Sequence, residues 1–163
     1  MARINLEYGR LDEAMKCYQK GYESVPGSNL PENQKKTWLG RLHHGTARTL
    51  ARMGKHQEAW AEVELIKKMI EDGGEPAKQY WPAWHYAAGY AKMEAGEYSA
   101  ALEHLKQADA NDPFHNLLLA RAYEKLGQKA EARQIYQKVL DSQQAGIERA
   151  LAYPEAKRKV HVL

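Results

Sequence analysis

Four glycines in this sequence are each followed by side chains of the same kind at the same spacing. An alanine comes five positions after each glycine, a bulky residue four positions later, and the pattern closes three positions further on. The four sets are Gly9, Ala14, Tyr18 and Gly21; Gly54, Ala59, Val63 and Ile66; Gly96, Ala101, Leu105 and Ala108; and Gly127, Ala132, Tyr136 and Val139. A short unit cannot bury its own apolar face, so recurring units stack on one another. The chain is therefore predicted to be a repeat protein.

Each unit is predicted to fold as a helix, a tight turn at the glycine, and a second helix. Glycine adopts a positive φ at little steric cost and commonly ends helices. The small residue followed by a large one lets the second helix pack closely against the first. The chain is rich in Ala, Leu, Glu, Lys and Gln and has one Phe, so helix formers dominate. The predicted fold class is all-α.

The spacing of the turn glycines predicts an irregular array. They lie 45, 42 and 31 residues apart, around the ~34 residues of a helical hairpin repeat. The extra residues fall in "GSNLPENQKKTW" and "DGGEPAKQYWP", read as loops or lengthened helix starts, with Pro31 and Pro82 in first turns. We expect one array over residues 1–163, with repeats at 1–26, 38–72, 82–113 and 114–144. A capping segment, interrupted at Pro154, is expected over 145–163.

The order of residues in the last unit resembles the tetratricopeptide repeat family. Leu119, Ala120 and Tyr123 precede Gly127 as that family's first helix implies, and Pro26 and Pro113 close the second helix in two units. The resemblance implies a right-handed α-α superhelix, or solenoid, whose first helices line a concave groove for a peptide. It also implies a non-enzymatic protein-protein interaction module or scaffold.

The same spacing predicts which side chains face that groove. Positions thirteen, ten, six and two before each turn glycine share one face of the first helix. They hold Ala83, Glu94, Phe114 and Leu117, together with the residues that we expect to bind the partner: Arg41, His44, Arg48, Arg52, Tyr86, Tyr90, Arg121 and Lys125.

Charge is unevenly distributed along the chain, although the net charge of +3 is too small to indicate a polyanionic partner. Residues 35–57 contain six Lys or Arg and no acidic residue. Beside the tyrosine pair, such a stripe suits an acidic or carboxylate-bearing peptide. A merely solvated helix face is the alternative.

No pattern indicates catalysis, a metal or a cofactor. The seven histidines lie in separate predicted elements without ligand spacing, and Cys17 has no His nearby in sequence. His43 is expected to be packed or hydrogen-bonded and His44 exposed. The four tryptophans are expected to pack between repeats rather than to anchor a partner.

Two other functions stay open at this stage. Met1 lies part-way through the first predicted helix, which leaves room for a longer natural chain and for a scaffold fragment that self-associates. An α-solenoid could also bind nucleic acid, with Arg41, Arg48 and Arg52 contacting phosphates. The sequence has no apolar run of about 20 residues and only one cysteine. We therefore expect no membrane span and, from the single cysteine, a cytoplasmic protein.

Overall fold

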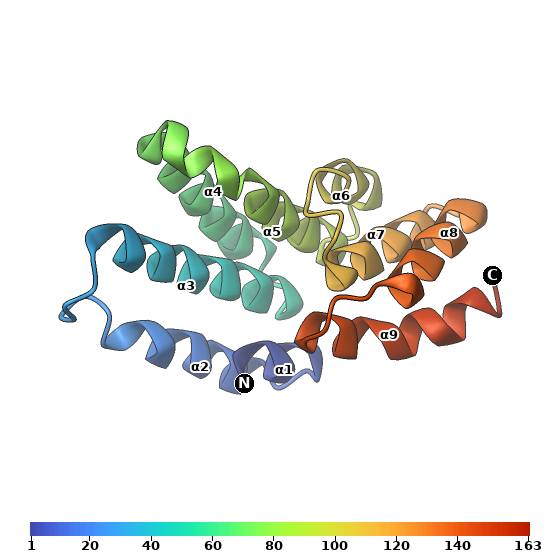
Figure 1. Cartoon of the computed structure of the whole chain (residues 1–163), viewed down its shortest axis with the longest axis horizontal. Coiled ribbons are helices and arrows are strands. Elements are labelled where there is room, and N and C mark those ends of the chain that lie inside the picture. The colour runs from blue at the N-terminus through green and yellow to red at the C-terminus, as the bar shows by residue number, and fades with distance from the viewer.

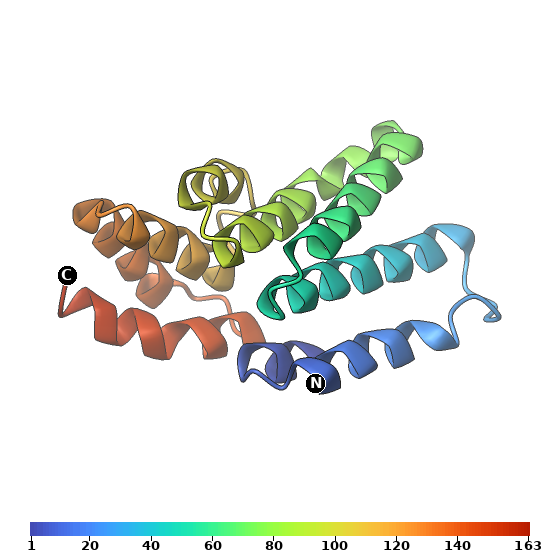
Figure 2. The same ribbon diagram turned by 180° about the vertical axis from the view of Figure 1, so that it is seen from behind.

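The computed structural model describes residues 1–163 and contains nine α-helices, one short 3₁₀-helix and no strand. The helices follow one another in two alternating layers, as Figures 1 and 2 show from opposite sides. Their bounds are α1 Ala2–Glu7, α2 Leu11–Glu23, α3 Glu32–Arg52, α4 His56–Gly73, η1 Glu75–Tyr80, α5 Trp81–Glu94, α6 Tyr98–Leu105, α7 Pro113–Lys125, α8 Lys129–Asp141 and α9 Ile147–Val160.

The four predicted turns are present, and all four have the same backbone geometry. Gly9, Gly54, Gly96 and Gly127 have φ values of 76°, 77°, 77° and 75°. The N–H of the next residue reaches back five positions to a carbonyl: Arg10 to Asn5, Lys55 to Leu50, Glu97 to Lys92 and Gln128 to Tyr123, at 2.8–3.0 Å. Together with the bond from each glycine N–H three positions back, this is the Schellman motif. The repeated glycine therefore ends the first helix of every hairpin, as predicted.

The small-then-large pattern packs the two helices of each hairpin together. Ala14, Ala59, Ala101 and Ala132 are fully buried, and so are the large residues Val63 and Tyr136. Tyr18 differs, because it is only half-buried and packs against α3 of the next hairpin. A Cβ atom added at Gly45 would lie 2.3 Å from the Tyr18 ring, so a glycine is needed there for the close approach.

The hairpins stack so that the first helices form one layer and the second helices another. In the inner layer, α1 contacts α3, α3 contacts α5, α5 contacts α7, and α7 contacts α9. In the outer layer, each of α2, α4, α6 and α8 packs against the inner helices on either side. Helix α9 therefore lies where the first helix of another hairpin would stand, as a capping helix (Figure 1).

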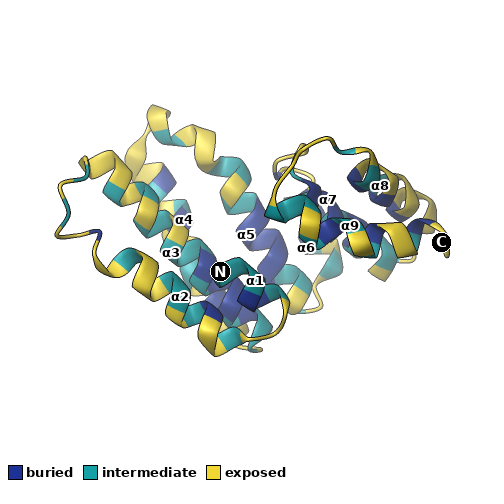
Figure 3. Ribbon diagram, turned by 60° about the horizontal axis from the view of Figure 1, so that its bottom comes forward, coloured by how far each residue is buried: buried dark blue, intermediate teal, exposed yellow.

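The main hydrophobic core runs from the second hairpin to the C-terminal helix. Figure 3 shows the buried residues between the layers and the exposed residues on the outer helix faces. The main cluster extends from Ala47 in α3 to Val160 in α9. Trp60, Trp81 and Trp84 pack against it, as expected, whereas Trp38 is 37% exposed.

Three of the prolines singled out in the sequence have different outcomes. Part of the extra sequence before the second repeat lengthens helix α3, which is one of the two expected alternatives, but α3 begins at Glu32, so Pro31 is its N-cap and precedes the first turn. Pro82 stands in the first turn of α5 as predicted. The predicted interruption at Pro154 is wrong, because α9 continues through it to Val160. Proline removes one hydrogen bond to the carbonyl four positions back. That carbonyl belongs to Ala150, which is an exposed residue.

Candidate partner-binding site on the inner helix layer

The eight predicted partner-binding residues lie on three helices of the inner layer but differ greatly in accessibility. The buried ones are Arg48, Tyr86 and Tyr90; the half-buried ones are His44, Arg52 and Arg121; and the exposed ones are Arg41 and Lys125. The structure therefore brings α3 and α5 residues of the set together in the interior and leaves two cations at the surface.

Arg48 is the centre of the buried part, with only 6% of its surface exposed. Its guanidinium donates hydrogen bonds to the hydroxyls of Tyr86 and Tyr18, both at 3.0 Å, and to the carbonyl of His44 at 3.2 Å. It also lies 5.3 Å from the centre of the Tyr86 ring and 5.9 Å from that of Tyr90. Burial disfavours the charge, but the tyrosine oxygens outweigh it and raise the pKa of Arg48 above its usual value.

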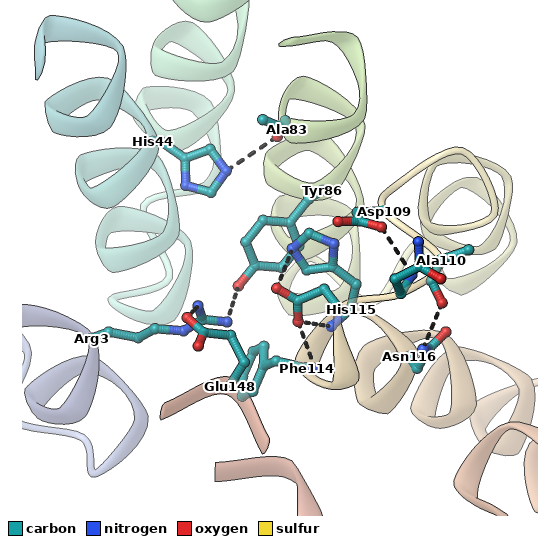
Figure 4. A network of polar contacts seen from close by, with 12 residues as sticks. Arg3, His44, Ala83, Tyr86, Asp109, Ala110, Phe114, His115, Asn116 and Glu148 are labelled. Carbon is teal, nitrogen blue, oxygen red and sulfur yellow. Dashed lines mark hydrogen bonds and ion pairs between the residues drawn. The ribbon is translucent and has the colours of Figure 1, made fainter. Parts of the chain in front are cut away.

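Tyr86 is held between two imidazole rings, as Figure 4 shows. The His115 ring stacks on it at 3.9 Å between centroids, and the His44 ring lies 5.0 Å away. His44 donates from Nε2 to the carbonyl of Ala83 at 3.1 Å. Burial and the charge of Arg48 lower the pKa of His44 well below its usual value, and burial lowers that of His115. Both rings are therefore neutral near pH 7.

Arg3 of α1 completes this cluster (Figure 4). It donates to Glu148 of α9 at 2.6 Å and to the Tyr86 hydroxyl at 3.4 Å, and its guanidinium lies 4.5 Å from the centre of the Phe114 ring. Arg3 thus joins the first and the last helix of the array. It is absent from the predicted set, although it stands six positions before Gly9, as Arg48 does before Gly54. Extending the same spacing to the first unit would have found it.

Two further inner-layer arginines are paired with carboxylates. Arg121 makes two hydrogen bonds to Glu155, at 2.8 and 2.6 Å, which is the bidentate geometry of a strong ion pair. Although burial acts in the opposite direction, this contact lowers the pKa of Glu155. Arg52 donates to the carbonyl of Leu6 at 3.0 Å and lies 3.8 Å from a carboxylate oxygen of Glu7. Arg3, Arg52 and Arg121 therefore each lie next to a carboxylate of this chain.

The exposed cations have no such partner. The guanidinium of Arg41 lies 4.8 Å from the centre of the Trp38 ring, and the ammonium of Lys125 lies 5.8 Å from that of Tyr98. Neither Arg41 nor Lys125 forms an ion pair. Each presents a positive charge beside an aromatic face. Arg and aromatic residues, as at Arg41 and Trp38, are enriched at protein interfaces.

The histidines are not all isolated from one another, contrary to what their sequence spacing indicates. His85 of α5 and His104 of α6 face each other across the third hairpin, with their Nδ1 atoms 3.1 Å apart. His43 is hydrogen-bonded as expected, with Nδ1 2.6 Å from Glu62. His44 is half-buried and bonded rather than exposed. No group of three or more His, Cys, Asp or Glu residues is arranged to hold a metal ion.

The inner and outer layers, the identical glycine turns and the capping helix define the molecule as a solenoid of helical hairpins with a polar inner face. Residues 92–152, from the end of α5 into α9, match the model of the tetratricopeptide repeat family. No curated protein and no solved structure matches the chain. Residues 92–152 are therefore similar to tetratricopeptide repeats. Such repeats generally mediate protein-protein interactions and are typically non-enzymatic. None of the helices has the length and apolar character that crossing a membrane requires.

Proposed function

We propose that this protein docks a partner peptide or protein on its inner helix layer and that the docked segment is acidic. The observation that supports this most is that Arg41 and Lys125 are exposed, lie beside aromatic rings and form no ion pair within the chain. Their positive charges are therefore available to the carboxylates of an acidic partner.

The predicted residues take different roles in this proposal. Arg41 and Lys125 are accessible and unpaired, so they make the first contacts with the partner. Arg52, Arg121 and His44 are half-buried and lie deeper on the same layer. Arg48, Tyr86 and Tyr90 are buried and act as the rigid floor that holds the others in place. Because these side chains are ordered before binding, little ordering cost falls on this side of the complex.

Selection from a displayed library of random peptides tests the acidic preference directly. We expect the wild-type protein to enrich sequences containing Asp and Glu, and Arg41→Glu to lose them because it reverses an accessible charge. Lys138→Glu is the matched control, since Lys138 is exposed on the outer helix α8 and forms no ion pair. Enrichment without acidic residues, or equal enrichment by Arg41→Glu, would refute the proposal.

Capture from a lysate with and without nuclease separates the proposal from nucleic-acid binding. An acidic protein retained after nuclease and lost with Arg41→Glu supports docking of an acidic segment. Loss of all captured material on nuclease treatment would instead favour the nucleic-acid alternative. We propose a cytoplasmic location as well, which the unpaired Cys17 supports, because free thiols are typical of reducing compartments.

A further inference from the structure

A pair of histidines on the third hairpin links an inner-layer helix to an outer-layer helix and is not among the residues assigned to partner docking. His85 stands on α5 and His104 on α6, and both are half-buried. Their Nδ1 atoms are 3.1 Å apart, so in the metal-free protein one ring donates a hydrogen bond to the other. The hairpin turn at Gly96 brings these two nitrogens together from opposite helices.

The distance between the two nitrogens also fits two neighbouring ligands of one metal ion. Imidazole nitrogens bind Zn²⁺ at about 2.0–2.1 Å. At this bond length, nitrogens 3.1 Å apart subtend an angle of about 100° at the metal. This value lies between the angles of square-planar and tetrahedral coordination, the geometries that Cu²⁺ and Zn²⁺ favour.

The surroundings hold both rings in place and keep them uncharged. The Trp84 ring packs edge-on against both, with centroids 4.6 Å from His85 and 5.1 Å from His104. Burial lowers the pKa of each imidazole, with the neighbouring histidine adding to the effect at His85 and Lys92 at His104. Lys92 itself is bonded to Glu97 at 2.7 Å, which offsets its charge. Neutral imidazole is the form that binds metals.

We propose that His85 and His104 form a two-nitrogen site for a divalent transition-metal ion, Cu²⁺ or Zn²⁺. Both Nδ1 lone pairs then point to the ion, so the ring that carried its proton on Nδ1 carries it on Nε2 instead. Water fills the remaining positions, because both rings are partly open to solvent. The ion joins α5 to α6 and so stabilises the third hairpin.

Titration with CuCl₂ tests the site through Trp84, whose fluorescence a bound Cu²⁺ ion quenches. We expect one saturable quenching transition in the wild type and in His161→Asn, a control that changes an exposed histidine near the C-terminus. The transition should be lost in His85→Asn and in His104→Asn. Identical titrations of the wild type and either of these two variants would overturn the proposal.

Two further measurements keep the test decisive if a variant folds poorly. The electron paramagnetic resonance spectrum of the Cu²⁺-loaded wild type should show two equatorial imidazole nitrogens, and a spectrum with fewer would overturn the proposal. Zn²⁺ at about 100 times its Kd should raise the Tm by about 5–10 °C in the wild type and in His161→Asn. An equal rise in His85→Asn would place the ion elsewhere.

Discussion

The ion pair between Arg3 and Glu148 ties the first helix of the array to the last, and a double-mutant cycle measures its strength. Helix α1 has six residues, well below the about 12–15 that an isolated helix needs, so its order depends on tertiary contacts. The two side chains are 18% and 28% exposed, and the shortest distance between them is 2.6 Å. Screening by water is therefore only partial.

These values set the size of the expected effect. A charged hydrogen bond contributes about 1.5–3 kcal/mol net, and partial exposure reduces this to a coupling of about 1–2 kcal/mol. Arg3→Met also loses the contacts with Tyr86 and Phe114 and leaves Glu148 unpaired. We expect this variant to lose about 2–3 kcal/mol of unfolding free energy.

Urea unfolding of the wild type, Arg3→Met, Glu148→Gln and the double variant gives the coupling. Hydrogen exchange should show faster exchange of α1 amides in both single variants, because the helix loses its link to α9. The pair between Lys67 and Glu71 on α4 is a control: it is more exposed, 3.9 Å apart, and expected to couple by about 0.3–0.5 kcal/mol. Additive effects at Arg3 and Glu148, or unchanged α1 exchange, would refute the reasoning.

Acid should destabilise the protein through the imidazoles that flank Tyr86. The folded-state pKa values of His44 and His115 lie below the ordinary 6.5, so the unfolded chain binds more protons as the pH falls below about 7. The unfolding free energy should therefore decrease from pH 7 to pH 5, and His44→Gln should flatten this dependence in urea unfolding, whereas His161→Gln should not. Turn and helix glycines should respond oppositely to alanine. Gly127→Ala should lower the unfolding free energy by about 1–2 kcal/mol because φ is 75° there. Gly21→Ala, at an exposed position inside α2 with space for a Cβ atom, should raise the unfolding free energy by about 0.5–1 kcal/mol. Thermal unfolding that shows both substitutions changing stability in the same direction would contradict this prediction.

The turns and the pairing of helices could be predicted from sequence because their causes are local. A positive φ at Gly54 and close packing at Ala59 depend on residues within one hairpin. The same local spacing placed Arg48 and Tyr86 on the groove face of their helices, and the structure brings the two side chains into a hydrogen bond. Their burial could not be predicted, because it depends on Tyr18 and on how tightly successive hairpins approach.

Non-local contacts explain the other differences. His85 and His104 are 19 residues apart, a separation with no meaning until the hairpin turn fixes which faces meet. The rule that proline interrupts a helix failed at Pro154, because it takes no account of where the freed carbonyl lies, and here it belongs to the exposed residue Ala150.

The constant geometry of the glycine turns closes every hairpin in the same way. Each turn joins the two helices of one hairpin, whereas the connections of varying length, residues 24–31, 74–80, 106–112 and 142–146, join a hairpin to the element that follows it. Helices α3 and α4 are longer than α5 and α6, and the hairpins from α3 onward still share one core. Added sequence in the connections 24–31 and 74–80, whose residues are mostly exposed, extends a hairpin outward without replacing core residues shared with its neighbours. These two connections are therefore the places where a foreign domain or label can be inserted with the array left intact.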